Sequence, residues 1–184
     1  MDYVVGFKNK MKKLTCLLLV IIWIFAFSGC NVIQSVIDFA EEREVDIDTA
    51  NAQGELIVEC FENRDEETLK SMFSQWIASK VNLEEQIKEA FKLFHGNVVE
   101  YTIGNGGISR TWDDGVATEK DVLLFVDITT DTGEKYDMSI KLYLSCDSDP
   151  SKIGISFINL HLLKYENGVY KYDVYDDNTY RNIG

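Results

Sequence analysis

The spacing of hydrophobic residues changes near the middle of the chain. Up to about Phe94, apolar residues recur every three or four positions, the period of one face of an α-helix. From Val98 onward, apolar and polar residues alternate, which is typical of β-strands with one buried face. Helices followed by a run of strands predict an α+β domain, in which N-terminal helices pack on an antiparallel sheet of about six strands.

Polar residues that cap helix N-termini mark where the helices of the domain are expected to begin. Gly96 is expected to stop the last of them. An additional short amphipathic helix is expected within residues 31–44. Its polar face is acidic, which favours packing on the domain over lying on a membrane. The predicted domain helices are 49–62 after the capping segment Asp46-Ile47-Asp48-Thr49, 66–74 after Asp65, and 83–94 after Asn82.

Turn sequences rich in Asp, Asn and Gly divide the second half of the chain into strands. Gly104-Asn105-Gly106-Gly107 is expected to form one turn, and Asp113-Asp114-Gly115 the next. Asn167-Gly168 is the clearest hairpin signal. The predicted strands are 98–103, 108–112, 121–130, 135–145, 154–165 and 169–175.

Alternation along the three longest predicted strands separates two faces of the sheet. One face is uniformly apolar and is expected to pack on the helices. The opposite face is mixed, yet too apolar to be fully solvated, so we expect it to bind a partner or to form a homodimer. The helix-facing set is Val122, Leu124, Val126, Ile128, Met138, Ile140, Leu142, Leu144, Ile158, Leu160 and Leu162; the outer set is Leu123, Phe125, Asp127, Lys141, Tyr143, Phe157, Asn159, His161 and Leu163.

A hydrophobic run near the N-terminus has the layout of an export signal. Lys12 and Lys13 precede an apolar stretch of 14 residues, which ends in Ser28-Gly29-Cys30. A cysteine directly after two small residues resembles the signal of bacterial lipoproteins, in which Phe27, Ser28 and Gly29 would form the lipobox with Cys30. The resemblance implies that residues 1–29 are removed and that Cys30 carries the lipid.

The alternative for this run is a retained membrane anchor, for which it is short, because a transmembrane helix needs roughly 20 apolar residues. Either interpretation places the domain on the extracytoplasmic side of the cell membrane. Met11 is a second candidate start, since the export signal begins there. The expected organisation is a signal at 1–29, a lipid-attached segment at 30–45, one domain at 46–176 and a C-terminal tail at 177–184.

Charge excludes one class of partner. The whole chain has a net charge of −13, and loss of the four lysines and one aspartate in residues 1–29 would take this to −16. Such an acidic chain is repelled by phosphate backbones, so nucleic acid is not an expected partner. Anionic lipid surfaces are equally poor electrostatic partners, so membrane attachment depends on the lipid of Cys30.

Two cysteines, Cys60 and Cys146, remain once Cys16 and Cys30 are assigned to the signal and the lipid. A disulfide between them is permitted outside the cytosol. Burial of two free thiols is the favoured alternative, since free cysteine is among the most buried residue types. Two cysteines and two distant histidines do not form a zinc pattern.

Three stretches carry a resemblance to a known family. They are CFENRDEETLKSMFS at 60–74, FKLFHGNVVEY at 91–101, and ISFINLHLL at 155–163 with the following ENGVYKYDV hairpin. Their order is similar to small lipoproteins of Gram-positive type, a family of unknown function with a nuclear transport factor two-like (cystatin-like) domain. The resemblance implies a cone, in which the sheet curves strongly around the helices. Its superfamily contains isomerases, dehydratases and polyketide cyclases, but also many non-catalytic binding domains.

Two functions therefore stay open. The expected one is non-catalytic binding of a small apolar ligand in the cone or of a protein on the sheet. The alternative is a cofactor-free isomerase, dehydratase or hydrolase that uses Asp127 and His161 as an acid/base pair. That pair would have to point into the cone, whereas alternation places it on the outer face. Tyr101, Tyr143 and His95 are further candidates, although His95 suits a cation at the end of a helix.

No cofactor or metal site is predicted. Acidic residues cluster at Asp113-Asp114, Asp147-Ser148-Asp149 and Asp176-Asp177. None of these clusters has the regular ligand spacing and glycine of a calcium loop. Aspartate is also an ordinary turn residue, which explains such pairs in a chain this acidic.

Overall fold

A computed structural model describes residues 37–166, 169–171 and 180–184 of the chain. The signal, the lipobox and Cys30 lie outside the described residues, as does Asp176-Asp177. The chain divides into two compact units, one up to Glu44 and the other Val45–Gly184. The second unit contains the α+β fold and is described below.

Residues 37–63 are helical throughout, and three shorter helices follow: α2 (Glu66–Met72), α3 (Gln75–Ala78) and α4 (Leu83–Leu93). The predicted caps of α2 and α4 are confirmed. The Asp65 carboxylate accepts from the N–H of Thr68, and the Asn82 side chain accepts from the N–H of Glu85. The short α3 was not predicted, and the Ser74 hydroxyl caps it.

The predicted helix start at Asp46-Ile47-Asp48-Thr49 is wrong, because these residues lie inside the helix. Thr49 Oγ1 donates to the carbonyl of Val45 four residues earlier, a bond typical of a threonine within a helix. The Asp46 carboxylate binds the sheet instead of a helix N-terminus. It lies 2.6 Å from Arg110 Nη2 and 3.4 Å from Lys120 Nζ.

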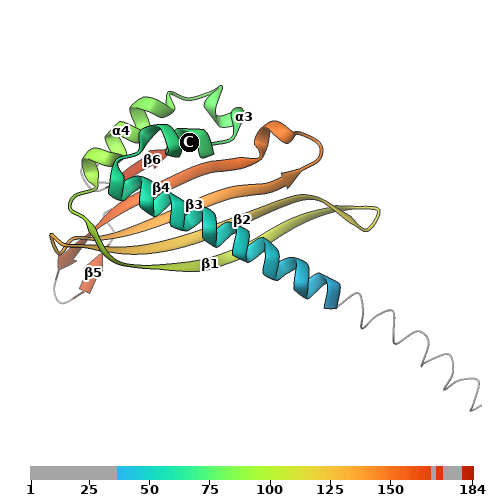
Figure 1. Ribbon diagram of the computed structural model, residues 1–184, viewed down its shortest axis with the longest axis horizontal. Helices are drawn as coiled ribbons and strands as arrows, with labels where there is room; N and C mark the ends of the chain where they lie inside the picture. The colour runs from blue at the N-terminus through green and yellow to red at the C-terminus, as the bar shows by residue number, and fades with distance from the viewer. Residues whose placement is uncertain (1–36, 167–168, 172–179) are drawn as a thin grey trace, which may run out of the picture. The chain divides into compact units, whose positions relative to one another are not determined.

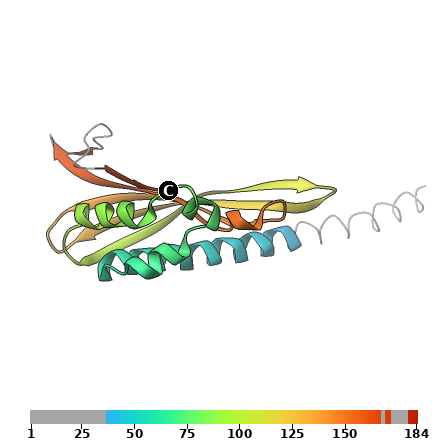
Figure 2. The ribbon, with the colours of Figure 1, turned by 90° about the horizontal axis from the view of Figure 1, so that it is seen from above.

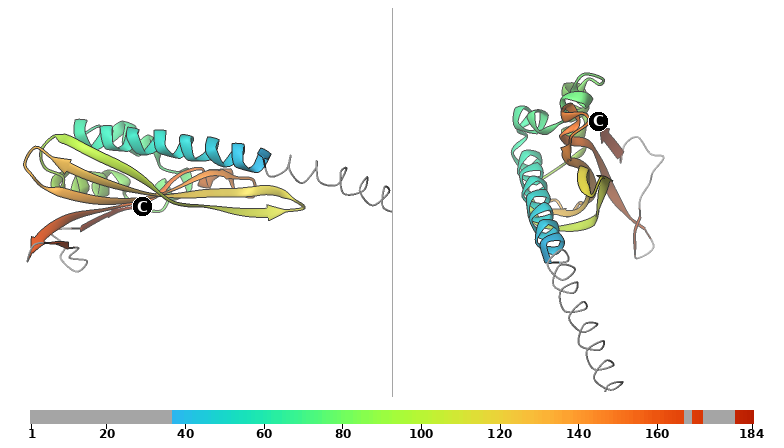
Figure 3. Two further views of the ribbon diagram at one scale, coloured as in Figure 1. Left: turned by 90° about the horizontal axis from the view of Figure 1, so that it is seen from below. Right: turned by 90° about the vertical axis from the view of Figure 1, so that its right-hand side faces the viewer.

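The strands form an antiparallel meander in chain order, and β6 pairs with β4 (Figure 1). Figures 2 and 3 show β4 and β5 bending away from the plane of β1–β3. The strands are β1 (Val98–Asp113), β2 (Val116–Thr130), β3 (Lys135–Cys146), β4 (Gly154–Glu166), β5 (Val169–Lys171) and β6 (Tyr180–Ile183), with a 3₁₀ turn, η1 (Pro150–Lys152), before β4.

The predicted turn at Gly104-Asn105-Gly106-Gly107 is wrong, because β1 continues through it with a register shift between Asn105 and Gly107. Gly106 is needed for packing: a Cβ there would lie 2.5 Å from Phe125 Cε2. The hairpin turn is Asp114-Gly115, as part of the predicted Asp113–Gly115 segment. Both have positive φ, +46° and +81°, as a type I′ turn requires.

The end of the chain also differs from the prediction. Residues 180–183, expected to belong to a C-terminal tail, form β6 beside β4. Ile183 pairs with Ile158 and is fully buried. A four-residue strand has too few alternating positions to produce a recognisable pattern, so only the paired tertiary structure reveals it.

The hydrophobic core lies between the helices and one face of the sheet, and in Figure 1 residues 45–63 of the long helix cross in front of the strands. Leu56 of the long helix lies at the edge of this core and is 37 % exposed. The predicted helix-facing side chains are confirmed: Val122, Leu124, Val126, Ile128, Met138, Ile140, Leu142, Ile158 and Leu160 are buried, with Leu144 and Leu162 partly buried against them.

Both cysteines of the domain are buried and free, as the favoured alternative predicted. Burial raises the pKa of the Cys60 thiol to about 11, and the nearby Asp65 and Glu59 carboxylates add to the shift. Cys60 therefore stays protonated and unreactive at neutral pH.

Candidate functional site

The outer face of the sheet holds the two residues that sequence analysis singled out as an acid/base pair. Asp127 is opposite Asp137 in the β2–β3 register, and Asp137 is opposite His161 in the β3–β4 register. The three residues thus form one row across the sheet, on the face away from the core. Asp127 is exposed, and Asp137 and His161 are half-buried.

Burial lowers the pKa of His161, while the adjacent Asp137 carboxylate acts in the opposite direction. The neutral imidazole is therefore favoured in the folded protein. This row is consequently a polar strip with a neutral histidine at one end and an exposed carboxylate at the other.

Apolar side chains adjoin this row on the same face. Phe125 is 43 % exposed and lies beside the Gly106 backbone of β1. Farther along the sheet, Leu123 is opposite Lys141, which is opposite Phe157. Lys141 Nζ lies 3.3 Å from an Asp121 oxygen. The outer face thus combines partly exposed aromatic and aliphatic groups with charged groups, a composition typical of protein-binding surfaces.

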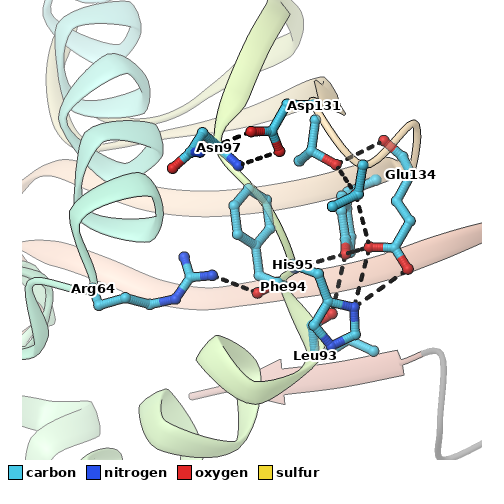
Figure 4. Close-up of polar contacts among 10 residues, drawn as sticks. Arg64, Leu93, Phe94, His95, Asn97, Asp131 and Glu134 are labelled. Atoms are coloured by element: carbon cyan, nitrogen blue, oxygen red, sulfur yellow. Dashed lines mark hydrogen bonds and ion pairs between the residues drawn. The ribbon is translucent and has the colours of Figure 1, made fainter.

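A second polar cluster lies where α4 passes into β1 (Figure 4). The Tyr136 hydroxyl accepts from the N–H of His95 and lies within hydrogen-bonding distance of Leu93 O (3.1 Å) and Glu134 Oε2 (2.8 Å). Burial raises the pKa of Tyr136 far above its ordinary value, so the hydroxyl keeps its proton. His95 Nδ1 lies 3.1 Å from Glu134 Oε2.

The turn between β2 and β3 is hydrogen-bonded to the segment between α4 and β1. The Asp131 carboxylate accepts from both the backbone N–H and the side-chain amide of Asn97, at 2.9 and 2.8 Å. The backbone N–H of Asn97 is the main cause that lowers the pKa of Asp131. Gly96 has a φ of +79°, and a Cβ there would lie 2.4 Å from Asp131 Oδ1. Gly96 therefore permits this contact, a need not visible in the sequence.

Arg64 joins two helix ends next to this cluster. It occupies the left-handed region with a φ of +58°, directly after the long helix, and Asp65 N–H closes the helix end on Cys60 O at 3.0 Å. Its guanidinium donates to Phe61 O and, at 2.6 Å, to Phe94 O. The arginine thus satisfies carbonyl groups at the C-terminal ends of both the long helix and α4.

This second cluster is best explained as a set of structural contacts that hold the helices and the sheet together. Arg64, Tyr136 and Asp131 each bond backbone groups of other segments. His95 is 55 % exposed in its side chain and contacts the Glu134 carboxylate, rather than making the predicted interaction with a helix end. Glu134 and Tyr136 were not singled out from the sequence, since no local motif marks them.

A surface groove of about 640 Å³ lies between α2 and α4. Lys88 crosses it, with Nζ 2.5 Å from a Glu84 oxygen and 3.6 Å from a Glu66 oxygen. Most of the residues that line it carry a charge: they are Arg64, Glu66, Asn82, Glu84, Glu85, Lys88, Glu89, Phe91 and Lys92. The groove therefore differs from the apolar ligand cavity that a binding cone would provide.

Two features are absent from the part of the chain that the structure describes. Within it, no three His, Cys, Asp or Glu side chains are grouped so as to hold a metal ion. Asp149 of the Asp147-Ser148-Asp149 cluster instead accepts from Ser151 N and Oγ, which caps η1. None of the helices in the described ranges combines the length and the apolar character needed to cross a bilayer.

Comparison with known families places most of the chain in a family. Residues 56–174 match the family described as a domain of unknown function, DUF5104. The chain belongs to this family. No curated protein matches the chain. The DUF5104 region begins within the long helix and includes both sheet-face sets and the Figure 4 cluster, so the family assignment covers the fold and leaves the activity open.

Proposed function

We propose that this DUF5104 protein is an extracytoplasmic lipoprotein, anchored by a lipid on Cys30, whose domain binds another protein without catalysing a reaction. The anchor rests on the sequence pattern of two lysines, an apolar run and Ser28-Gly29-Cys30. The binding role rests on the outer sheet face, where Phe125 remains 43 % exposed among charged neighbours.

The domain is further proposed to be a nuclear transport factor two-like (cystatin-like) cone. The order of its elements supports this assignment, since helices precede an antiparallel meander and pack on one face of it. The sheet also bends at β4 and β5 (Figure 3).

The packing favours a protein partner over a small apolar ligand. The interior between helices and sheet contains large buried side chains, among them Phe61, Phe94 and Tyr136. Phe61 and Phe94 contact one another at 5.5 Å between ring centroids, and Phe94 lies 4.7 Å from Tyr136. Asp127 and His161, the pair of the enzymatic alternative, lie on the outer face away from this interior.

The anchor is tested by metabolic labelling with a fatty acid. The wild-type protein should incorporate the label, and Cys30→Ala should not, because the acylated thiol is absent. Cys60 and Cys146 serve as internal controls, since both are buried. Label that persists in Cys30→Ala would overturn the lipoprotein assignment.

The binding face is tested with a photo-crosslinking amino acid in place of Phe125, in cells. The matched control replaces Trp76, an aromatic residue of similar exposure, 38 %, on α3 in the helical layer. Crosslinks to a defined protein at position 125 but not at position 76 are expected. Equal crosslinking at both positions would contradict a role for the outer face.

A homodimer through the same face is the simplest form of this proposal. Size-exclusion chromatography with light scattering should then show a dimer that Phe125→Asp converts to a monomer. A strict monomer at high concentration would remove the homodimer and leave a different protein as the partner.

A further inference from the structure

The β1–β2 hairpin projects beyond the rest of the sheet (Figure 1). Pairing of β2 with β3 begins only at Glu119, whereas pairing of β2 with β1 continues to Val116 opposite Asp113. The tip, residues 112–117, is therefore a two-stranded ribbon without a third strand beside it in the described part of the sheet. Such ribbons are only marginally stable in water on their own.

Large apolar side chains are exposed at this end of the domain. Val116 is 63 % exposed and Trp112 is 49 % exposed, both on the tip. Val45, the first residue of the domain unit, is also 63 % exposed. Exposed apolar groups that gather at one end of a domain indicate a contact surface.

An ion cluster fixes the tip next to the point where the N-terminal segment enters the domain. The Asp46 carboxylate binds Arg110 and Lys120, which are opposite one another on β1 and β2. The side chains of Arg110 and Asp46 are only 6 % and 11 % exposed. Three residue pairs, about 10 Å of strand, separate this cluster from the turn. The tip and Val45 thus lie at the same end of the domain.

We propose that this hairpin tip lies on the membrane surface, with Trp112 and Val116 in the interfacial region of the lipids. The inference rests on the proposed lipid anchor, because Cys30 is only 15 residues before Val45. Residues 37–45 of that segment are helical, so it spans at most about 40 Å. The anchored segment therefore joins the domain at the tip end, opposite the Asp131–Gly133 turn at the far end of β2.

The chemistry of the tip specifies the kind of lipid surface. Tryptophan favours the interface between water and hydrocarbon, where its ring is buried and its N–H stays hydrated. Asp113 and Asp114 lie between Trp112 and Val116 at the turn. Anionic lipids repel their carboxylates. The tip should therefore bind zwitterionic surfaces, and more weakly as the fraction of anionic lipid rises.

Two equally exposed valines provide a matched test. Val116→Cys places a thiol on the tip, and Val99→Cys places one on β1 near the far end of the sheet, where Val99 is 62 % exposed. An environment-sensitive dye attached to the lipidated full-length protein in phosphatidylcholine vesicles should shift to the blue at position 116 and not at position 99. Cys60 and Cys146 are buried and should not react.

The lipid dependence gives a second measurement on the same protein. Added phosphatidylglycerol should reduce the shift at position 116, and Asp114→Asn should restore part of it, since asparagine tolerates the φ of +46° at this site.

The outcomes separate this inference from the lipoprotein proposal. A wild-type protein that incorporates fatty acid and floats with vesicles, while the dye at position 116 reports only water, would overturn the membrane contact and leave the anchor in place. Equal shifts at positions 116 and 99 would also overturn it, because contact would not be confined to the tip. Failure to incorporate fatty acid would instead contradict the anchor.

Discussion

Two neighbouring leucines on β2 have opposite surroundings. Leu124 points to the helices and is fully buried, and its Cδ1 would lie 3.2 Å from a Cβ placed on Gly54 of the long helix. Leu123 points to the outer face and is only partly buried. The same side chain thus meets a closely packed core on one face of the sheet and a mixed, solvated surface on the other.

The two faces of the sheet therefore suit different tasks: one stabilises the domain, and the other suits the recognition of a partner. The helix-facing set is entirely apolar, so its burial supplies the hydrophobic stabilisation of the domain. The outer set includes Asp127, Lys141 and His161, whose charges and hydrogen bonds suit the selection of a partner better than the formation of a core. Substitutions on the two faces should accordingly affect different measurements.

The largest effect is expected for Leu124→Ala compared with Leu123→Ala. Removal of the fully buried side chain leaves a cavity and should lower the free energy of unfolding by about 2–5 kcal/mol. Leu123→Ala should cost about 1 kcal/mol or less, since that side chain already contacts water. Urea denaturation of both variants measures the difference. Equal losses would show that the outer face is a second core.

A smaller loss in the free energy of unfolding is expected for Tyr136→Phe. This change tests the hydrogen bonds of the Tyr136 hydroxyl where α4 passes into β1. The change keeps the ring and removes the hydroxyl that accepts from His95 N–H and lies near Leu93 O. Buried backbone groups without partners cost about 1–3 kcal/mol in the free energy of unfolding. Chemical denaturation measures the loss, and an unchanged midpoint would show that water replaces the hydroxyl.

Substitutions of Arg64 test how the ends of the long helix and α4 are held together. Arg64→Ala loses the bonds to Phe61 O and Phe94 O but keeps the left-handed φ of +58°. Arg64→Gly loses the same bonds and removes the backbone strain, so it should be more stable than Arg64→Ala by about 1 kcal/mol. Thermal unfolding of the two variants compares them. A less stable glycine variant would contradict the assigned strain.

The smallest effect concerns the pH dependence of the outer face. Because burial lowers the pKa of His161 below its ordinary 6.5, the unfolded chain binds the proton more readily. Stability should therefore fall as the pH decreases through about 6.5, and it should stop falling below the folded pKa. His161→Gln should reduce this dependence below about pH 6.5. An identical pH profile in the variant would show that His161 does not contribute.

Much of this architecture was predictable because it depends on local chemistry. The cap residues Asp65 and Asn82 define α2 and α4 through bonds to N–H groups three residues away. Alternation assigned the two faces along most of β2 to β4, since successive side chains of a strand point in opposite directions. The Asp114-Gly115 turn followed from the positive φ values that these residues tolerate.

Two of the failures share one cause, which is that a distant segment decided the local conformation. Gly104–Gly107 resembles a turn, but pairing with β2 and packing of Phe125 keep it in a strand. Asp46 resembles a cap, but Arg110 and Lys120 bind it within a helix. In both cases tertiary contacts outweigh a local preference of about 1 kcal/mol.

By itself, the sequence determined the α+β order, the two sheet faces and the expectation of an exported, lipid-bearing chain, because these depend on periodicity and on contiguous residues. Only the tertiary structure decided which polar residues meet: Asp127 with Asp137 and His161 in one row, His95 with Glu134, and Arg64 with two helix ends. Those contacts join positions far apart in the chain, and strand register and helix packing, rather than any local pattern, bring them together.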